Sequence, residues 1–306
     1  MGIQRSATRG RSTVEREAIG DTLPLSFVPR RNSMPTYDFD DTVAFVTGAA
    51  RGQGESHAVN YAKHGADVVI TDICENIDTN PYELGTRDEL EDTASRIEDE
   101  GGNALVLEMD VREEDEVESA VDEALDEFGK IDVLANNAGI FNASDLVEMD
   151  EAMWDDMIDT NLKGVWLCSK HVGKHFVDRG DGGKIVSTSS TAGLTGALSS
   201  GHYAATKHGV IGLTKTLALE LAEYDVNVNA VCPTGVDTRM ISGYTEAYGE
   251  EMLEEMGEMT GPFNLFGDGG MIESQEISEA YLWLSSDAAR YVTGVALPVD
   301  AGYTAK

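Results

Sequence analysis

The chain has 306 residues, 41% of them hydrophobic, and 22 basic against 56 acidic side chains give it a formal net charge of −34. So strong a negative charge would repel nucleic acids and anionic lipids, and we expect neither as a partner. The sequence contains no apolar run of about eighteen residues, which argues against a membrane-spanning helix. The acidic, lysine-poor composition is similar to that of salt-adapted cytosolic proteins, and it predicts a halophilic, cytoplasmic protein.

The three cysteines, Cys74, Cys168 and Cys232, lie far apart in the sequence and form no Cys-x-x-Cys pair. Scattered cysteines of this kind are typical of packed, reduced thiols. We therefore expect neither a disulfide nor a metal site.

The N-terminal segment differs in composition from the rest of the chain. Residues 1–33 hold six arginines against three acidic residues and show no sustained hydrophobic periodicity. Arg30 and Arg31 form a twin-arginine pair, but no hydrophobic region follows them, so we do not expect an export signal. Two interpretations remain for residues 1–36: a disordered arm, or a start assigned too early, with Met34 as the true start. We favour the second.

From Tyr37 onward, short apolar runs alternate with stretches of helical periodicity. This alternation predicts one α/β domain over residues 37–306, a Rossmann-type doubly wound fold with a seven-stranded parallel sheet and helices on both faces. The expected strands are 43–47, 67–71, 104–109, 131–135, 184–188, 227–231 and 295–299. The expected helices are 53–64, 87–100, 113–128, 151–178, 202–222 and 275–285.

Residues 237–271 interrupt the alternation with five methionines and several glycines. They follow a strand, at the carboxyl edge of the sheet, where ligands bind in folds of this kind. The composition predicts a mobile lid over a substrate pocket. The alternative is an amphipathic helix that packs its methionines into the core.

The turn 47–54, Thr-Gly-Ala-Ala-Arg-Gly-Gln-Gly, separates the first expected strand from the first expected helix. Gly48 allows a tight turn, Gly52 lets the backbone approach a pyrophosphate, and Gly54 lets helix and strand pack closely. The phosphates of a dinucleotide would bind at the helix N-terminus, whose N–H groups favour negative charge. Asp72 ends the next apolar run, where a carboxylate that binds ribose belongs.

Tyr203 and Lys207 are four residues apart on an expected helix, so their side chains share one face. The ordinary pKa of tyrosine is about 10, and a neighbouring ammonium group would lower it and favour proton transfer. Ser190 follows the expected strand 184–188, and Asn137 follows the expected strand 131–135. Their positions bring both side chains to the same edge of the sheet.

Together these motifs resemble the short-chain dehydrogenase/reductase family. The resemblance runs from Phe39 to the C-terminus and rests on the turn 47–54, Asp110-Val111, residues 136–139 (Asn-Asn-Ala-Gly), Asn161, Ser190, Tyr203, Lys207 and residues 233–235 (Pro-Thr-Gly). It implies that Tyr203 is the acid/base on the substrate oxygen and that Ser190 hydrogen-bonds this oxygen. Lys207 would bind the nicotinamide ribose and lower the pKa of Tyr203, and Asn161 would hold a water in a proton relay.

The resemblance also implies where a dinucleotide cofactor would bind. Its contacts would come from the glycine turn and from the carboxyl ends of the strands. The implied cofactor-binding residues are Gly48, Arg51, Gly52, Gln53, Gly54, Asp72, Ile73, Asp110, Val111, Asn137, Ala138, Gly139, Tyr203, Lys207, Pro233, Val236 and Thr238.

Two residues point to different cofactors. Arg51 resembles the arginine that binds the 2′-phosphate in relatives that use NADP. Asp72 would instead accept a hydrogen bond from a free 2′-hydroxyl and repel that phosphate, at a cost of about 4 kcal/mol for close unit charges at intermediate dielectric. Because Ile73 supplies no positive charge, we expect NAD rather than NADP.

A narrower resemblance is to the carveol-dehydrogenase-like, mycofactocin-associated branch of the family. It rests on Gln53, on an insertion over residues 75–89 that contains Pro81 and Tyr82, and on the sequence Cys-Pro-Thr-Gly at 232–235. Members of this branch resemble one another in retaining NAD tightly. The insertion leaves its strand beside the expected ribose site, so we expect it to fold over the cofactor.

We therefore expect an oxidoreductase that interconverts a secondary alcohol and a ketone by hydride transfer and that holds NAD tightly. The alternative is a sugar or polyol dehydrogenase with exchangeable NAD(P), which a polar lid containing Asp237, Glu246 and Asn264 would favour. A non-catalytic cofactor-binding regulator is disfavoured, because the three reacting residues are present. The expected partners are a small alcohol or ketone, further copies of the chain in a homotetramer, and an external electron acceptor.

Overall fold

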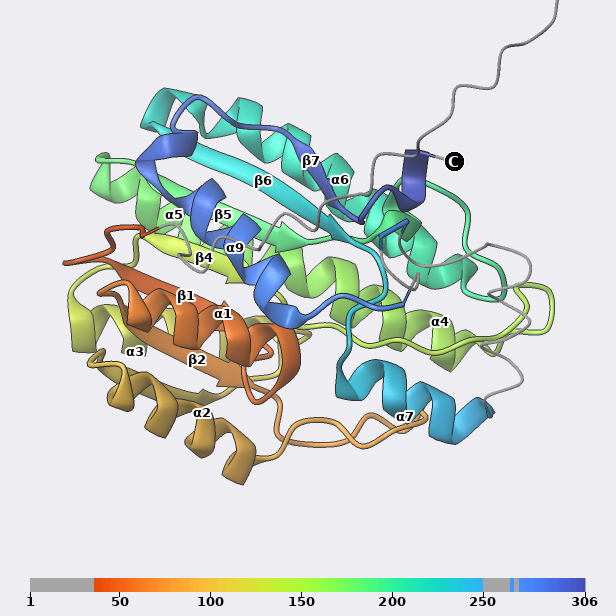
Figure 1. Cartoon of the computed structure of the whole chain (residues 1–306). Helices are drawn as coiled ribbons and strands as arrows, with labels where there is room; N and C mark the ends of the chain where they lie inside the picture. Colours follow the sequence, from red (N-terminus) through yellow and green to blue (C-terminus); the bar gives the residue numbers. More distant parts are fainter. Residues whose placement is uncertain (1–35, 250–264, 267–269, 306) are drawn as a thin grey trace, which may run out of the picture. The chain divides into compact units, whose positions relative to one another are not determined.

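The computed structural model describes residues 36–249, 265–266 and 270–305, which belong to the compact unit Thr36–Lys306 (Figure 1). The expectation of an arm or a late start at the N-terminus lies outside the described residues. In the part of the chain that is described, no helix is long and apolar enough to cross a bilayer.

A seven-stranded parallel sheet forms the centre of the molecule, with strand order β3-β2-β1-β4-β5-β6-β7. In β1, Val46 pairs with Ile70 of β2 on one side and with Ala135 of β4 on the other. The chain therefore runs outward in both directions from β1 and β4, and this reversal opens a crevice at their carboxyl ends. The strands are β1 Val43–Thr47, β2 Asp67–Asp72, β3 Ala104–Glu108, β4 Val133–Asn136, β5 Gly183–Thr188, β6 Val226–Pro233 and β7 Ala296–Val299.

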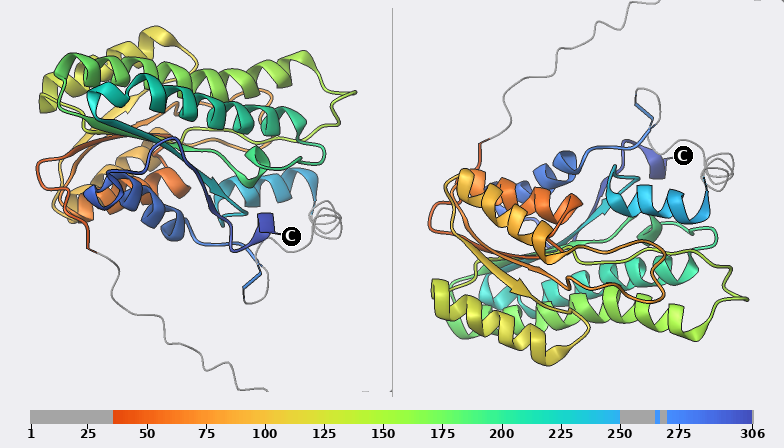
Figure 2. Two further views of the ribbon diagram at one scale, coloured as in Figure 1. Left: turned by 90° about the horizontal axis from the view of Figure 1, so that it is seen from above. Right: turned by 90° about the horizontal axis from the view of Figure 1, so that it is seen from below.

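Helices cover both faces of the sheet, as the two views of Figure 2 show. Helices α1 (Gly52–Lys63), α2 (Arg87–Asp99) and α9 (Ser274–Ser285) lie on one face, and α3 (Glu114–Phe128), α5 (Gly164–Arg179) and α6 (Gly201–Glu220) lie on the other. Short 3₁₀ turns are η2 Thr191–Gly193, η3 Ala222–Tyr224, η4 Asp287–Ala289 and η5 Tyr303–Ala305. The predicted fold, a doubly wound α/β domain, is confirmed.

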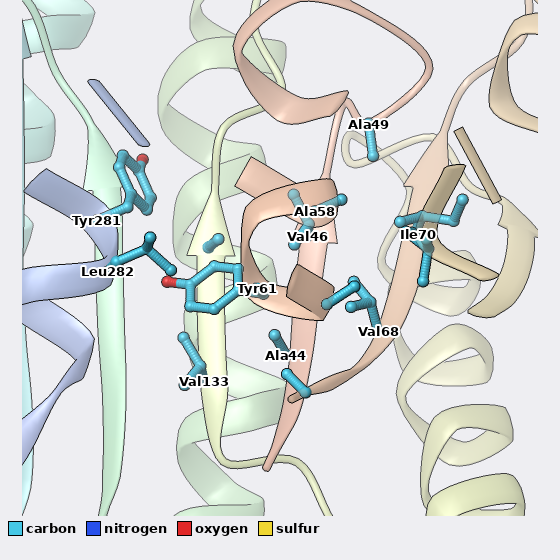
Figure 3. Close-up of a cluster of buried hydrophobic side chains, with 14 of the residues drawn as sticks. Ala44, Val46, Ala49, Ala58, Tyr61, Val68, Ile70, Val133, Tyr281 and Leu282 are labelled. Carbon is cyan, nitrogen blue, oxygen red and sulfur yellow. The ribbon is translucent and has the colours of Figure 1, made fainter. Parts of the chain in front are cut away.

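Each face of the sheet carries its own hydrophobic core. Figure 3 shows the first, a cluster that contains Val46 and Ile70 of the sheet, Tyr61 of α1, and Tyr281 and Leu282 of α9. All five are fully buried, and each such side chain stabilises the fold by about 1.5–3 kcal/mol. These contacts fix α1 and α9 on the sheet, and with them the turn that precedes α1.

The helix expected over residues 151–178 contains a turn of another kind. It consists of α4 (Glu151–Ile158), a π-helical turn η1 (Asp159–Lys163) and α5. Such turns are frequent at functional sites, and this one carries the fully buried Asn161. The prediction of one continuous α-helix was therefore wrong at η1. The hydrophobic periodicity continues through η1 and does not reveal the wider turn.

Within the region expected to interrupt the alternation, residues Arg239–Tyr248 form helix α7. Its Gly243 and Tyr244 are buried, and its Met240 is half-buried against the cavity described below. An amphipathic helix therefore occupies the first part of this region. The expected lid extends further, into residues 250–264 and 267–269, which lie outside the described residues.

Candidate active site

A cavity of about 300 Å³ lies at the carboxyl ends of the strands, where the crevice between β1 and β4 opens. Most of the residues singled out in the sequence line it. They are Gly48, Arg51, Gly52, Gln53, Asp72, Ile73, Asp110, Val111, Asn137, Ala138, Gly139, Ser190, Tyr203, Lys207, Pro233, Val236 and Thr238. Gly54 and Asn161 are not part of this lining.

The glycine turn has a backbone that larger residues would disrupt. Gly48 and Gly52 have φ angles of +66° and +64°, in the left-handed region that favours glycine. A Cβ on Gly54 would lie 2.0 Å from the Gly48 carbonyl oxygen, so helix α1 and the turn after β1 approach each other only because position 54 has no side chain. Helix α1 begins at Gly52, and its N-cap residue Arg51 provides no side-chain cap. These residues fit a dinucleotide whose phosphates take the place of that cap.

Asp72 stands at the end of β2, beside this turn. Its carboxylate accepts a hydrogen bond from the Ala50 amide at 3.1 Å. Burial raises the pKa of Asp72, while this bond, a second from Cys74 and the nearby charge of Arg51 act in the opposite direction. The carboxylate is thus held in place by the glycine turn, which suits the binding of a ribose hydroxyl.

The guanidinium group of Arg51 is already bound by the insertion. It donates a hydrogen bond to the carbonyl oxygen of Glu83 and lies 3.7 Å from the Glu89 carboxylate. In the same segment, a Cβ on Gly85 would meet Asp72 Oδ1 at 3.1 Å. The insertion therefore closes over Asp72 and engages the arginine that resembled a 2′-phosphate ligand.

Tyr203, Lys207 and Ser190 meet at another part of the cavity. Lys207 Nζ lies 5.4 Å from the centre of the Tyr203 ring and donates a hydrogen bond to the Thr188 carbonyl oxygen at 2.8 Å. Ser190 is the N-cap of the short turn η2, and its hydroxyl accepts a hydrogen bond from the Ala192 amide at 3.1 Å. A hydrogen bond also joins Ser190 to Tyr203, so the two hydroxyl groups can face one substrate oxygen.

The pKa values of this group differ from the expectation. Burial raises the pKa of Tyr203 to about 12, and the hydrogen bond from Ser190 opposes that rise. Burial lowers the pKa of Lys207 to about 8. The expected lowering of the tyrosine pKa by the lysine is therefore not met, because burial disfavours both the phenolate and the ammonium form.

Asn161 lies behind the cavity wall. Its Oδ1 accepts a hydrogen bond from the Ile140 amide at 2.8 Å, and its Nδ2 donates to the Ile140 carbonyl oxygen at 2.9 Å. The side chain thus fixes the loop that follows β4. Its role in a proton relay stays a prediction.

Several residues of the cavity were missed in the sequence. Phe141 stands edge-on to Tyr203, with ring centres 4.9 Å apart and planes at 85°, and its ring lies 5.1 Å from that of Tyr244. Tyr82, from the insertion, lines the same region. These aromatic side chains come from segments far apart in the chain, and only the position of Tyr82 within the insertion gave a signal.

The fold and the site define a dinucleotide-binding oxidoreductase with a tyrosine, a lysine and a serine at its reacting end. A family model described as Enoyl-(Acyl carrier protein) reductase matches residues 48–304. Over 274 residues the chain is 42% identical to (-)-trans-carveol dehydrogenase of Rhodococcus erythropolis. The aligned region covers 86% of this chain and 98% of that relative. The chain therefore belongs to the short-chain dehydrogenase/reductase family, as its sequence motifs predicted.

Solved structures agree with this assignment. Carveol dehydrogenase from Mycobacterium avium, in complex with NAD, matches with a TM-score of 0.82 and 38% identity over 89% of this chain and 100% of that one. A short chain dehydrogenase from Mycobacterium paratuberculosis, bound to NAD, matches with a TM-score of 0.81 and 31% identity. The match covers 88% of this chain and 100% of that one. The predicted resemblance to carveol dehydrogenase is thus confirmed.

Proposed function

We propose that the protein interconverts a secondary alcohol and a ketone by hydride transfer, with NAD as its cofactor. The observation that carries this proposal is one cavity that joins the glycine turn and Asp72 to Ser190, Tyr203 and Lys207. When bound, NAD supplies the acceptor or donor of the hydride. The protein supplies binding, orientation and proton transfer.

Each reacting side chain has a task that its position supports. The Tyr203 hydroxyl donates a proton to a ketone oxygen, or takes one from an alcohol. The Ser190 hydroxyl hydrogen-bonds the same oxygen and stabilises its developing charge. Lys207, only 4% exposed, orients the nicotinamide end and supports proton exchange at Tyr203, and Asn161 holds the loop behind them.

NAD is favoured over NADP by the surroundings of Asp72. A 2′-phosphate would meet this carboxylate, and Arg51, which could have neutralised the phosphate, is engaged with Glu83 and Glu89. Gly85 also packs against Asp72 and leaves little room beside it. The two solved relatives that hold NAD support the same choice.

The substrate is an apolar alcohol rather than a sugar. Aromatic rings of Phe141 and Tyr244 line the cavity beside Tyr203. Two polar residues that favoured a polyol, Asp237 and Glu246, are exposed, and Glu246 pairs with Arg239 at 2.7 Å. The third, Asn264, lies outside the described residues. An apolar wall of this kind suits a cyclic or hydrocarbon skeleton with one hydroxyl group.

The insertion supports slow exchange of the cofactor. The insertion contacts Asp72 through Gly85 and Arg51 through Glu83. It would therefore cover the adenosine end of the bound nucleotide. Because affinity differences fall mostly on the off-rate, a covered nucleotide leaves slowly. We therefore propose that alcohol oxidation uses an external electron acceptor that reoxidises the bound cofactor.

We also propose a homotetramer. Helices α4 and α5 expose Trp154 (40%) and Trp166 (43%), and α6 exposes Leu219 (82%). Large apolar side chains on these helices suit a subunit interface. Native mass spectrometry would show the tetramer, and a monomer at micromolar concentration would contradict it.

The function is tested by incubating the protein with (-)-trans-carveol, cyclohexanol or sorbitol, and with either free NAD or an artificial redox dye. We expect oxidation of the first two, faster with the dye, and little oxidation of sorbitol. Failure of every secondary alcohol in both arms would contradict the proposed reaction. Rapid turnover with free NAD alone, by nucleotide-free protein, would contradict only the slow exchange.

A further inference from the structure

The insertion reaches beyond the nucleotide end of the cavity. In Figure 1 the trace between β2 and α2 runs out to α7 before it returns. Tyr82 lies at this contact and is only 8% exposed. A Cβ on Gly243 of α7 would lie 2.5 Å from Tyr82 Cβ and 2.8 Å from its Cγ. The tyrosine therefore packs against bare backbone of α7, and only glycine at position 243 allows that approach.

The hydroxyl group of Tyr82 contacts a second element. It accepts a hydrogen bond from the backbone amide of Phe141 at 3.2 Å. Phe141 belongs to the loop after β4, and its ring stands edge-on to Tyr203 and close to Tyr244. One side chain of the insertion thus joins α7 to the residue that borders the reacting tyrosine.

Further contacts hold the insertion in this place. Ile77 is buried in a small cluster with Ile140 and Met157, against which Tyr203 also packs. The Thr79 carbonyl oxygen accepts a hydrogen bond from Asn142 Nδ2 at 3.1 Å. The segment that begins beside the ribose site is therefore also packed against the substrate site.

We propose that Tyr82 is a positioning residue of the substrate site, which holds Phe141 against Tyr203 and α7 over the cavity. The segment between β2 and α2 then forms one wall that the nucleotide and substrate ends share. Substrate binding depends on this wall, since Phe141 and Tyr244 are its aromatic surface. This inference rests on the proposed function, because it assigns the aromatic surface to an apolar alcohol.

The test uses full-length protein with saturating NAD and compares Tyr82→Phe and Gly243→Ala with wild type. Tyr82→Phe keeps the ring but leaves the Phe141 amide without its acceptor, and Gly243→Ala pushes α7 from the tyrosine. Tyr61→Phe is the matched control: it removes a buried hydroxyl that bonds Ser285 at 2.7 Å in the core between α1 and α9. Hydrogen exchange at residues 139–143 and 239–249 is the first readout, and steady-state kinetics is the second.

We expect Tyr82→Phe to speed amide exchange in both segments by about tenfold, while Tyr61→Phe leaves them unchanged. With the alcohol that wild type oxidises best, KM should rise about tenfold and kcat should change less than about threefold, because binding rather than chemistry is weakened. Unchanged exchange in both test variants, or an equal effect in Tyr61→Phe, would overturn the proposal. Lack of turnover by wild type would count against the proposed reaction alone, since the hydrogen-exchange measurement still tests the role of Tyr82.

Discussion

Tyr203 and Lys207 lie one helical turn apart on α6, and burial moves their pKa values apart, to about 12 for the tyrosine and about 8 for the lysine. The phenol therefore stays protonated at neutral pH and is ready to donate to a ketone oxygen. The lysine pKa lies close to neutral pH, where proton exchange through it meets the smallest barrier. The same pair of side chains thus donates a proton in ketone reduction and accepts one in alcohol oxidation.

Replacing Tyr203 by phenylalanine tests this assignment. The ring and its contact with Phe141 remain, so fold and cofactor binding should be kept, while kcat falls by about 10²–10⁴ with the loss of a positioned acid/base. Stopped-flow or steady-state assays with the best alcohol measure the loss. Near wild-type turnover in the variant would mean that another group moves the proton.

The cofactor preference has its own residue-level test. Asp72→Ala removes the carboxylate that would repel a 2′-phosphate, and the preference for NAD over NADP should narrow by about tenfold or more. The ratio of kcat/KM for the two cofactors measures this. Because Arg51 is bound by Glu83 and Glu89, we do not expect the preference to invert. A wild-type preference for NADP would show that Arg51 decides the choice.

Residues in local motifs were predictable, and residues brought together by distant segments were not. Tyr203 and Lys207 are one helical turn apart, and Gly48, Gly52 and Gly54 share one turn, so spacing predicted that each set lies together, and the family resemblance indicated their chemistry. The contact of Tyr82 with Gly243 joins positions 161 residues apart (243 − 82 = 161). No periodicity records such a contact, since it depends on how the insertion and α7 fold back over the sheet.

At the scale of elements, the apolar runs located every strand, with ends shifted by at most two residues. Strands buried on both faces are nearly continuous apolar segments, which is why the runs were clear. Two elements were not predicted in this way. The π-helical turn at Asp159–Lys163 keeps the periodicity of its neighbours, and α7 was expected only as the alternative to a lid, in a segment rich in glycine and methionine.

The contact between α1 and α9 predicts how stability depends on pH. His57 of α1 is 1% exposed, stacks on Tyr281 at 4.0 Å and shares a hydrogen bond of 2.8 Å with Ser278 of α9. Burial lowers its pKa from 6.5 to about 3. Its contribution is therefore complete above pH 6.5 and is lost as the pH falls toward 3, because only the unfolded chain takes up the proton in that range.

His57→Gln should reduce this acid sensitivity. Between pH 6.5 and 5 the wild type should lose about 2 kcal/mol more unfolding free energy than the variant. Urea unfolding at a series of pH values gives the slopes. His208→Gln, an exposed position on α6, is the control and should retain the wild-type slope. Equal slopes in wild type and His57→Gln would contradict the account of this interface.

At the scale of the whole molecule, the net charge of −34 is the main influence on how stability depends on salt. Self-repulsion of so many carboxylates destabilises the compact state, and salt at molar concentration screens charges within a Debye length of about 3 Å. The melting temperature should therefore rise steeply between dilute buffer and molar KCl. Differential scanning calorimetry across a KCl series measures it, and a flat or falling melting temperature would remove the interpretation as a salt-adapted surface.

The proposed reaction transfers a hydride from a carbinol carbon to bound NAD. The most direct measurement uses secondary alcohols deuterated at that carbon, incubated with the NAD-loaded protein, followed by mass spectrometry of nucleotide extracted with organic solvent. A single turnover is enough, so slow cofactor exchange does not obscure the result. We expect reduced nicotinamide that carries one deuterium, formed by wild type and hardly at all by Tyr203→Phe in the same time. Nucleotide without deuterium, from every alcohol supplied, would contradict it.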